Sequence, residues 1–542
     1  MARDAEIAPL GQIEQRTGAQ VTATEDELTV SFGELVATVP LPPDDRPDVA
    51  DGWALLDFRR ALPGRGRGDQ REMLISAIVQ DAAPGHTRLQ SAALDDALAD
   101  RSQALFAARE VWQRDEIAAV LRDQYFVTPS KSARSRPFLF PFQSALPVNY
   151  RQRGQYKMFR SDILMLLCWD GTDIDPEPVR GICELLNDRE SLTLLDGVMV
   201  DAALRFAGDG AVEEISAENL LGSDQADKVR RDLAGGPAFA QGCLDRFRED
   251  IVVALDLELP RHDKVAAVIH TLALHLALYY YEISARLGQG IDAITRAAAG
   301  MEAAAGGGIA GRLRFRVGTA GDRPVSGDHG CVTAWRELDD GYLIAYSPNL
   351  ICCNLLHRVS RSANPGITDA VDPEALASAM RGNPELASLI DASASALAVL
   401  YSSRAAGASP DALAGTAKME PGPYALRSAV LGHRRKTLKH LSRDVVNQLV
   451  RRPFGGSLIR TRGRYNFFEL DEEFLFLLVK FVLVRARRDE VQFSQFLSGL
   501  ALYGLVPQDA AERETLASAL ERLGMLSRYS DAGEATYVRH PL

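Results

Sequence analysis

The sequence has few of the features that mark an exported or membrane-spanning protein. Its N-terminus is acidic and polar, where a secretory signal would need an apolar run. The most apolar stretches, Val265 to Tyr281 and Phe474 to Val484, are too short or too interrupted to cross about 30 Å of hydrocarbon. A disulfide framework is not expected either, because the six cysteines have no paired spacing. We therefore expect a cytoplasmic protein with no membrane partner.

A complete catalytic or nucleotide-binding motif is also missing. The stretch Gly306 to Leu313 has the glycine spacing of a phosphate-binding loop. However, Arg312 stands where a lysine should reach the phosphates, and Leu313 stands where a Ser or Thr hydroxyl should bind magnesium. We interpret this stretch as a flexible linker, and we expect no cofactor and no catalytic residue in the chain.

Two groups of residues have side chains that could hold a metal ion. Cys353 and His357 lie four apart on an expected helix, but no second ligand pair accompanies them, so buried core residues are favoured. Four carboxylates lie close together in a loop, and their hard oxygen atoms suit a divalent cation (Asp170, Asp173, Asp175 and Glu177). A metal-dependent nuclease is therefore an alternative function, although solvated loop charge is the favoured interpretation. His270 and His275 are interpreted as core histidines.

Length and periodicity predict a mainly helical protein of several domains. The 542 residues exceed the roughly 250 to 300 that one core supports. Hydrophobic residues make up 46% and charged residues 25%, which is ordinary globular usage. The pattern divides into four regions: 1–126, a β meander over Gln20 to Leu41 with a long helix over Ala92 to Tyr125; 138–302, all helical; 312–465, mixed; and 466–542.

The mixed region 312–465 is expected to contain a β hairpin, several helices and a basic segment. Cys331 to Leu338 and Tyr342 to Tyr346 flank Asp339-Asp340-Gly341, a sequence that suits a tight turn between two strands. Helices are expected after this hairpin, the last of them over Tyr424 to Val450.

The C-terminal region 466–542 predicts a winged helix-turn-helix. Helices are expected at Asp471 to Arg485, Glu490 to Leu502 and Ala510 to Leu523, and two short strands follow at Met525 to Tyr529 and Ala535 to Arg539. The alternative is a plain helical cap. The third helix would be the recognition helix, but it is rich in acidic residues, which is unusual for a helix in a DNA groove. Its charge therefore favours packing or protein contact.

A strongly basic segment precedes this region. Between Arg427 and Arg464 there are eleven Lys or Arg residues against one acid, Asp444, which gives +10 in a chain whose net charge is -12 and leaves -22 for the rest. Such a segment can neutralise phosphates and release counterions. The candidate nucleic-acid-binding residues are Arg434, Arg435, Lys436, Lys439, Arg443, Arg451, Arg452, Arg460, Arg462 and Arg464. A solvated face, or a patch that docks an acidic protein, is the other interpretation.

The tail from Leu523 to Arg539, which includes the sequence from Ser530 to Arg539, resembles the terminal segment of accessory subunits in prokaryotic anti-phage restriction operons. It is similar to that of the non-ATPase subunit of DNA-phosphorothioation-dependent restriction systems. The resemblance implies a subunit that works beside separately encoded P-loop ATPase and helicase partners. The sequence thus predicts a non-catalytic DNA-associated or scaffolding subunit of a bacterial defence or DNA-processing complex, with a pure protein-interaction module as a further alternative.

Overall fold

The computed structural model of the chain describes residues 7–24, 27–41, 161–188, 215–233, 238–302, 307–318, 323–364, 372–406, 421–438, 446–447, 449–451, 456–529 and 535–541, with isolated positions between 78 and 119. Its helices are α1 (Ile7–Thr17), α6 (Ser161–Leu167), α7 (Pro176–Asn187), α9 (Ala217–Leu221), α10 (Asp224–Asp232), α11 (Gln241–Leu255), α12 (Arg261–Ala298), α13 (Gly330–Trp335), the π-helix η1 (Arg336–Leu343), α14 (Tyr346–Ala363), α15 (Pro373–Gly382), α16 (Pro384–Ala406), α17 (Gly422–Leu438), α19 (Glu472–Ala486), α20 (Phe493–Ala501) and α21 (Ala510–Arg522).

The described strands form three small sheets. They are β1 (Gln20–Ala23), β2 (Glu27–Phe32), β3 (Leu35–Pro40), β4 (Leu313–Val317), β5 (Ile459–Arg462), β6 (Tyr465–Leu470), β7 (Glu490–Gln492), β8 (Leu505–Pro507), β9 (Leu526–Tyr529) and β10 (Ala535–Arg539). The sheet orders are β1-β2-β3, β7-β10-β9 and β5-β6-β4-β8. In the last sheet β4 is parallel to both neighbours, whereas β5 and β6 are antiparallel.

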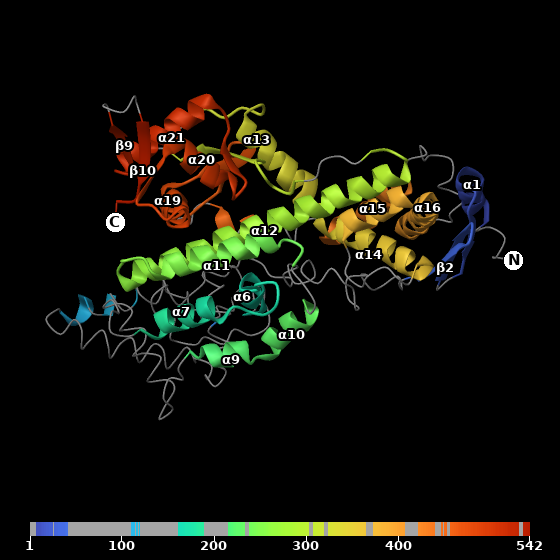
Figure 1. Cartoon of the computed structure of the whole chain (residues 1–542), viewed down its shortest axis with the longest axis horizontal. Coiled ribbons are helices and arrows are strands. Elements are labelled where there is room, and N and C mark those ends of the chain that lie inside the picture. The colour runs from blue at the N-terminus through green and yellow to red at the C-terminus, as the bar shows by residue number, and fades with distance from the viewer. Residues whose placement is uncertain are drawn as a thin grey trace.

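The long helix α12 is the central element of the arrangement. It contains 38 residues, so it extends about 57 Å at 1.5 Å per residue. Figure 1 shows α14, α15 and α16 near one end, α19, α20 and α21 near the other, and α6, α7, α9 and α10 below. Residues on every side of α12 are buried, including Tyr279, Tyr280 and Tyr281. A helix that is apolar all round is expected to lie inside a protein, and α12 does so.

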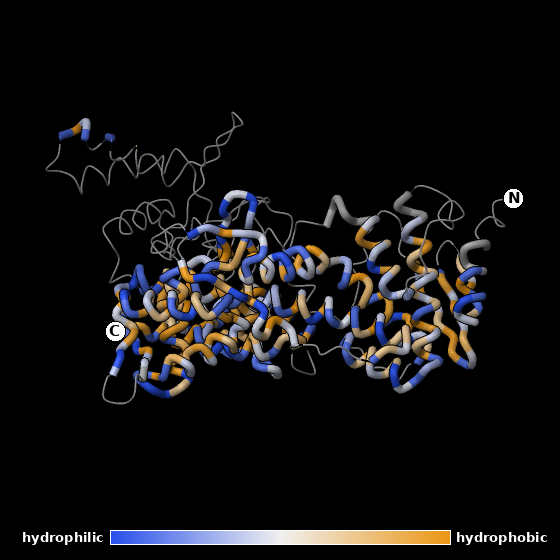
Figure 2. Tube along the Cα trace, turned by 90° about the horizontal axis from the view of Figure 1, so that it is seen from above, coloured by the Kyte–Doolittle hydropathy of each residue, from blue (hydrophilic) through white to orange (hydrophobic). Residues whose placement is uncertain are grey.

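The hydrophobic core follows α12 through the described part of the chain. Buried residues from the N-terminal sheet to the C-terminal strands belong to one continuous cluster. Figure 2 shows hydrophobic segments concentrated toward the inside of the arrangement, with hydrophilic segments mostly at its edges. The ring of Tyr281 meets that of Phe468 at 5.6 Å between centroids, edge to face, which joins α12 to β6.

The N-terminal meander predicted from Gln20 to Leu41 is confirmed. Gly33 turns the chain between β2 and β3 at a φ of +58°, a conformation that glycine adopts without strain. The sheet packs against α14 and α16. In this contact the Thr38 N–H of β3 donates to Ser362 Oγ of α14 at 2.8 Å. Helix α1, which precedes the meander, was not predicted. The long helix predicted over Ala92 to Tyr125 lies mostly outside the described residues.

The hairpin predicted between Cys331 and Tyr346 is wrong. This segment continues through α13, η1 and the start of α14. Cys331, Trp335 and Leu338 are all buried, and their spacing of four and three residues is helical. The Asp-Asp-Gly sequence indicated a turn, but it lies inside the π-helix. Packing of η1 against α12 outweighs that local preference.

A hairpin exists further along the chain, where the sequence suggested a glycine- and arginine-bearing loop. Ile459 to Arg462 and Tyr465 to Leu470 pair in antiparallel register as β5 and β6. Gly463 closes the turn at a φ of +57°. Along β5, Ile459 is buried, Arg460 and Arg462 are half-buried, and Thr461 is exposed.

The three predicted C-terminal helices and two terminal strands are present as α19, α20, α21, β9 and β10. The second helix begins three residues later than predicted, because Glu490 to Gln492 pair with β10 as the strand β7. Strand β8, which pairs with β4, was not predicted. Asp471 begins α19 by accepting a hydrogen bond from the Phe474 N–H at 3.1 Å.

Candidate functional site

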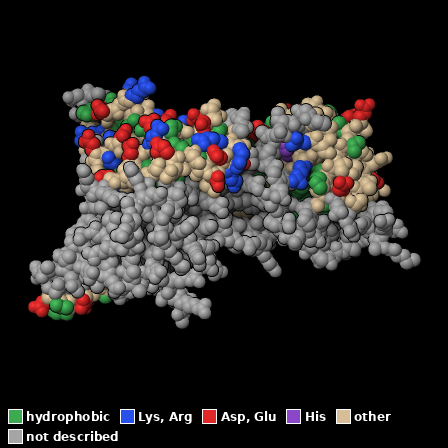
Figure 3. Space-filling view, turned by 90° about the horizontal axis from the view of Figure 1, so that it is seen from below, with side chains coloured by type: hydrophobic (Ala, Val, Ile, Leu, Met, Phe, Trp, Pro, Cys, Tyr) green, Lys and Arg blue, Asp and Glu red, His purple; other side chains and the backbone are tan. Residues whose placement is uncertain are grey.

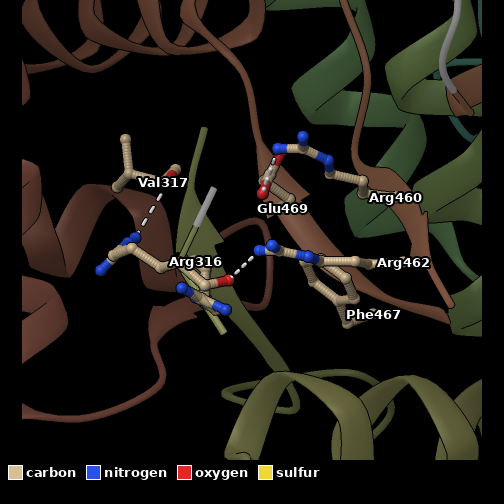
Figure 4. Close-up of a pocket in the computed structure, with 7 residues that line it drawn as sticks. Arg316, Val317, Arg460, Arg462, Phe467 and Glu469 are labelled. Carbon is tan, nitrogen blue, oxygen red and sulfur yellow. Dashed lines mark hydrogen bonds and ion pairs between the residues drawn. The ribbon is translucent and has the colours of Figure 1, made fainter. Parts of the chain in front are cut away.

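A pocket lined by arginines lies where β4 meets the β5–β6 hairpin (Figure 4). We call it the arginine pocket, and its lining residues are Arg316, Val317, Arg323, Arg460, Arg462, Phe467 and Glu469. They come from β4, from the segment that follows it and from the hairpin. Arginine at a concave site is suited to binding phosphate or carboxylate, because its planar fork donates two parallel hydrogen bonds.

The pairing of the strands explains why these side chains meet. Arg316 on β4 is aligned with Glu469 on β6, and Phe467 on β6 is aligned with Arg460 on β5. Aligned residues on neighbouring strands project from the same face of a sheet, and so do residues two apart on one strand. Arg462 therefore shares this face, and in Figure 4 its side chain extends toward Arg316.

Two carboxylates fix two of the arginines. Arg460 Nη1 donates to both carboxylate oxygens of Glu469, at 2.8 and 3.1 Å. Arg323 donates from Nη1 and Nη2 to the two oxygens of Glu512, at 3.0 and 2.9 Å. The bond to Glu512 is the main cause that raises the pKa of Arg323 above its usual value. The contact of Arg323 with Glu512 joins two nitrogens to two oxygens and is bidentate, the strong form of this pairing, whereas Arg460 directs one nitrogen at both oxygens of Glu469.

Glu512 belongs to α21, and its side chain is only 2% exposed. Besides binding Arg323, it accepts a hydrogen bond of 2.7 Å from the Val317 N–H at the end of β4. The first turn of α21 is thus packed against the sheet that carries the arginine pocket. The sequence analysis gave packing or protein contact as the role of the acidic charge of this helix, and Glu512 serves packing.

Arg316 is the most buried of the lining arginines, with a side chain 6% exposed. Its Nη1 donates to the Pro324 carbonyl oxygen at 3.2 Å, and its guanidinium carbon lies 6.0 Å from the centre of the Phe467 ring. Its Nε finds no hydrogen-bond partner among the described residues. An oxygen of Glu512 lies 4.0 Å from this nitrogen, which is too far for a hydrogen bond.

Four of the ten basic residues predicted to bind nucleic acid lie on or beside the β5–β6 hairpin. Arg460 and Arg462 line the arginine pocket, and Arg462 Nη1 donates to the Arg323 carbonyl. Arg464 lies exposed at the turn, where it donates to the Tyr465 hydroxyl at 2.7 Å and stacks on its ring. Arg451 donates to Thr461 and, at 3.4 Å, to Asn466.

The remaining six predicted residues are not placed at this site. Arg434, Arg435 and Lys436 belong to the last turns of α17, and their side chains lie outside the described part of the chain. The other three lie outside the described residues altogether (Lys439, Arg443 and Arg452).

The sequence analysis missed Arg316 and Arg323, which lie more than a hundred positions before the basic segment. A signal was present, because Arg312, Arg314 and Arg316 alternate with apolar residues as a half-buried strand does. Nothing in one sequence reveals that this strand pairs with β6.

The carboxylate cluster that suggested a nuclease makes local structural contacts. Asp170 accepts hydrogen bonds from the N–H groups of Asp173 and Thr172, and these bonds lower its pKa, the one from Asp173 most. Asp173 binds Arg230 at 2.7 Å, which lowers the pKa of Asp173, and Asp175 begins α7 by accepting from the Glu177 N–H at 3.1 Å. No group of three or more His, Cys, Asp or Glu within the described ranges could hold a metal ion.

The glycine-rich stretch and His275, which the sequence analysis also considered, make structural contacts inside the protein. The N–H groups of Gly307 and Gly308 donate to Gln289 at 3.1 Å each, and that of Ile309 donates to Glu282 at 2.8 Å. Amides that would have to face a phosphate are therefore turned toward α12. Buried His275 lies 3.0 Å from Asp250, as expected for a core histidine.

No protein-family model matches the sequence, and no curated protein matches it either. The resemblance of the C-terminal tail to accessory restriction subunits therefore stays a prediction.

None of the helices in the described parts of the chain is long and apolar enough to cross a bilayer.

Proposed function

We propose that the chain is a non-catalytic, nucleic-acid-associated subunit, and that it holds phosphate at the arginine pocket and the adjoining β5–β6 hairpin. The observation that carries this proposal is the convergence of guanidinium groups from separate segments on one concave site. Around it, the described residues supply four arginines against Glu469 and Glu512. An excess of positive charge in a recess concentrates anions, because the low-dielectric walls focus the field.

The proposed contact with nucleic acid is confined to the hairpin and does not extend over a broad basic surface. Figure 3 shows Lys and Arg side chains interspersed with Asp and Glu over the described part of one face. A mixed surface of this kind repels a phosphate backbone about as much as it attracts it. The hairpin differs, because exposed Arg464 extends the row of Arg460 and Arg462 toward solvent. A strand of nucleic acid would therefore meet the chain at this edge.

We further propose that α19, α20 and α21 with the β7-β10-β9 sheet form a winged helix-turn-helix that serves assembly. The contacts of Glu512 with Arg323 and Val317 support this use, because they place the first turn of α21 against β4 instead of leaving it open to a groove. Such a unit fits a scaffolding subunit of a bacterial defence or DNA-processing complex. Its partners would be a separately encoded ATPase or nuclease, as the resemblance of the tail implies.

The DNA-binding proposal is tested by a salt titration of the full chain on fluorescently labelled DNA. The double variant Arg462→Gln, Arg464→Gln should weaken binding. It should also reduce the slope of log affinity against log salt by about one unit or more, since each lost phosphate contact removes roughly 0.7 to 0.9. The matched control is Arg381→Gln with Arg488→Gln, two exposed arginines outside the hairpin. The control should bind as the parent does.

Equal affinity and equal salt slope in the parent and the hairpin variant would contradict the proposal. Loss of binding in both variants would also count against it, because that result would assign the attraction to overall charge. Purification of an ATPase partner with the chain, in the absence of any DNA affinity, would favour the pure protein-interaction module.

A further inference from the structure

The turn of the β5–β6 hairpin places an arginine over a tyrosine ring. The Arg464 guanidinium carbon lies over the Tyr465 ring at 5.0 Å from its centre, and Nη2 donates to the Tyr465 hydroxyl at 2.7 Å. Tyr465 is aligned with Arg462 on β5, so it projects from the face that carries the arginine pocket. Arg464 is exposed and Tyr465 is half-buried. A planar cation is therefore presented to solvent beside the pocket, with a ring beneath it.

Both side chains of this stack are held in place by the fold. The Tyr465 ring packs against buried Val332 and Phe467. Gly327 approaches the ring so closely that a Cβ there would lie 3.4 Å from Tyr465 Cε1. The Tyr465 hydroxyl in turn holds Arg464. A preformed stack loses less conformational entropy on binding a ligand than a loose side chain does.

Neither the hairpin nor α21 is free to enter the groove of a duplex. Strand β6 pairs with β4 as well as with β5, and its neighbouring residues Phe467 and Phe468 are both buried, on opposite faces of the strand. The first turn of α21 is held against β4 by Glu512. A duplex offers only the edges of its bases in the grooves, whereas a single strand exposes the base faces on which guanidinium groups and aromatic rings stack.

We propose that the turn of the hairpin binds single-stranded nucleic acid, with an unpaired base stacked on the Arg464 guanidinium over Tyr465 and the adjoining phosphate beside Arg462. This rests on the proposed nucleic-acid-binding function and names the form of nucleic acid that is bound. Charge alone would give the opposite preference, because a duplex has the higher density of phosphates. A preference for the single strand therefore reports contacts with bases.

The test measures binding of the full chain, at one fixed salt concentration, to labelled DNA of one sequence in three forms. They are the single strand, the blunt duplex, and an abasic strand that keeps every phosphate and lacks the bases. The parent should bind the single strand about tenfold more tightly than the abasic strand, the effect of stacking one base, and also more tightly than the duplex. A single strand of RNA with the same sequence is included, and whichever strand binds more tightly identifies the source of the base.

Four variants assign the preference to the stack. Arg464→Lys keeps the charge but loses the plane, so it should bring the ratio of affinities between the single strand and the abasic strand close to one, with an unchanged salt slope. Tyr465→Leu keeps an apolar side chain for packing and should lower the same ratio, whereas Tyr465→Phe keeps the ring and should retain it. Arg488→Lys, an exposed change outside the hairpin, should bind as the parent does.

An abasic strand bound as tightly as the single strand, a duplex bound more tightly than either, or an unchanged ratio in Arg464→Lys overturns the inference. If binding is then still salt-sensitive and still weakened by the double variant Arg462→Gln, Arg464→Gln, the proposed function stands. If the parent binds none of these nucleic acids, both fail.

Discussion

The Tyr503 hydroxyl donates a hydrogen bond of 2.6 Å to Asp250, although the two residues lie 253 positions apart. The same carboxylate oxygen lies 3.0 Å from His275 Nε2, and the other accepts from Arg485 at 2.8 Å. This buried cluster joins α11, α12 and the C-terminal helices. Burial alone would lower the pKa of Arg485, but Tyr503 and Asp250 outweigh it and raise that pKa.

Removing the carboxylate should therefore loosen the C-terminal region from α11. We expect Asp250→Ala to lower the free energy of unfolding by about 3 to 5 kcal/mol, the cost of breaking a buried charge pair. Tyr503→Phe should cost about 1 to 2 kcal/mol, because it removes one hydrogen bond and leaves the packing. Denaturant unfolding of both variants measures these values. Glu249→Gln is the control: its contact with Arg485 is exposed, so it should change stability by less than about 1 kcal/mol.

The anchoring of α21 by Glu512 leads to a second prediction. Glu512→Gln should lower the unfolding midpoint and weaken the C-terminal packing by about 2 to 3 kcal/mol, because Arg323 loses its bidentate partner and the Val317 N–H keeps at most a neutral one. Glu514→Gln, an exposed change on the same helix, should have little effect. Hydrogen exchange at β4 should rise in the first variant and not in the second. If Glu512→Gln and Glu514→Gln changed the unfolding midpoint and the hydrogen exchange at β4 equally, Glu512 would not anchor the helix.

A third prediction concerns pH and Asp471. Burial raises the pKa of this carboxyl to about 7, with a smaller contribution from neighbouring Glu473 and opposition from the N–H groups of Ser457 and Phe474. The folded state therefore binds a proton that the unfolded chain releases above its ordinary pKa near 4. The contribution of the protonated side chain is present below about pH 4 and is lost as the pH rises through about 7.

Asp471→Asn imitates the protonated form and should remove this dependence. Between pH 4 and pH 7 the stability of the parent relative to the variant should fall, by about 1 to 4 kcal/mol. Denaturant unfolding of both proteins at several pH values measures the difference. A difference that stays constant or rises with pH would show that Asp471 is ionised throughout.

Close packing around α12 leads to a fourth prediction. A Cβ at Gly288 would lie 2.4 Å from Tyr342 Cδ1, so Gly288→Ala must displace η1 from α12 and should destabilise the protein by about 1 to 3 kcal/mol. A Cβ at Gly432 in α17 would have no neighbour within 4 Å among the residues that the structure describes. Gly432→Ala should instead be neutral or stabilise by up to about 1 kcal/mol, through helix propensity. Thermal unfolding of the two variants in parallel separates the effects.

The thiols provide a fifth prediction. All six cysteines are free and buried. Burial raises the pKa of Cys243 to about 11 and that of Cys183, Cys331 and Cys352 to about 12. Because the thiolate is the reactive form, native protein at pH 8 should react slowly with an aromatic disulfide reagent, and all six thiols should react in denaturant. Fast labelling of one thiol in native protein would identify a region that opens.

Local sequence patterns predicted much of the secondary structure, but they predicted little of how the β-strands pair with one another. The meander and the C-terminal helices follow from periodicity and from turn glycines such as Gly33, which depend on neighbours in sequence. The segment around Asp339 was misjudged, because its helical state depends on packing against α12. The segment around Arg460 was misjudged for a similar reason, since its strand needs β6 as a partner.

Two of the four arginines of the candidate site could be predicted from the sequence. Arg460 and Arg462 were identified because they belong to a dense run of basic residues. Arg316 and Arg323 were not, because a parallel pairing between β4 and β6 leaves no trace in the spacing of residues. The contacts of Glu469 with Arg460 and of Glu512 with Arg323 were not predicted either.

The contact between Arg323 and Glu512 joins parts of the chain that are synthesised at different times. The two residues are 189 positions apart, so the strand that carries Arg316 leaves the ribosome long before its neighbours β6 and β8 and the helix that holds it. Pairing across such a separation requires a large loop to close, which slows folding. The edge that carries the arginine pocket is therefore expected to form last, after α21 has been synthesised, and β4 is expected to lack its strand partners until then.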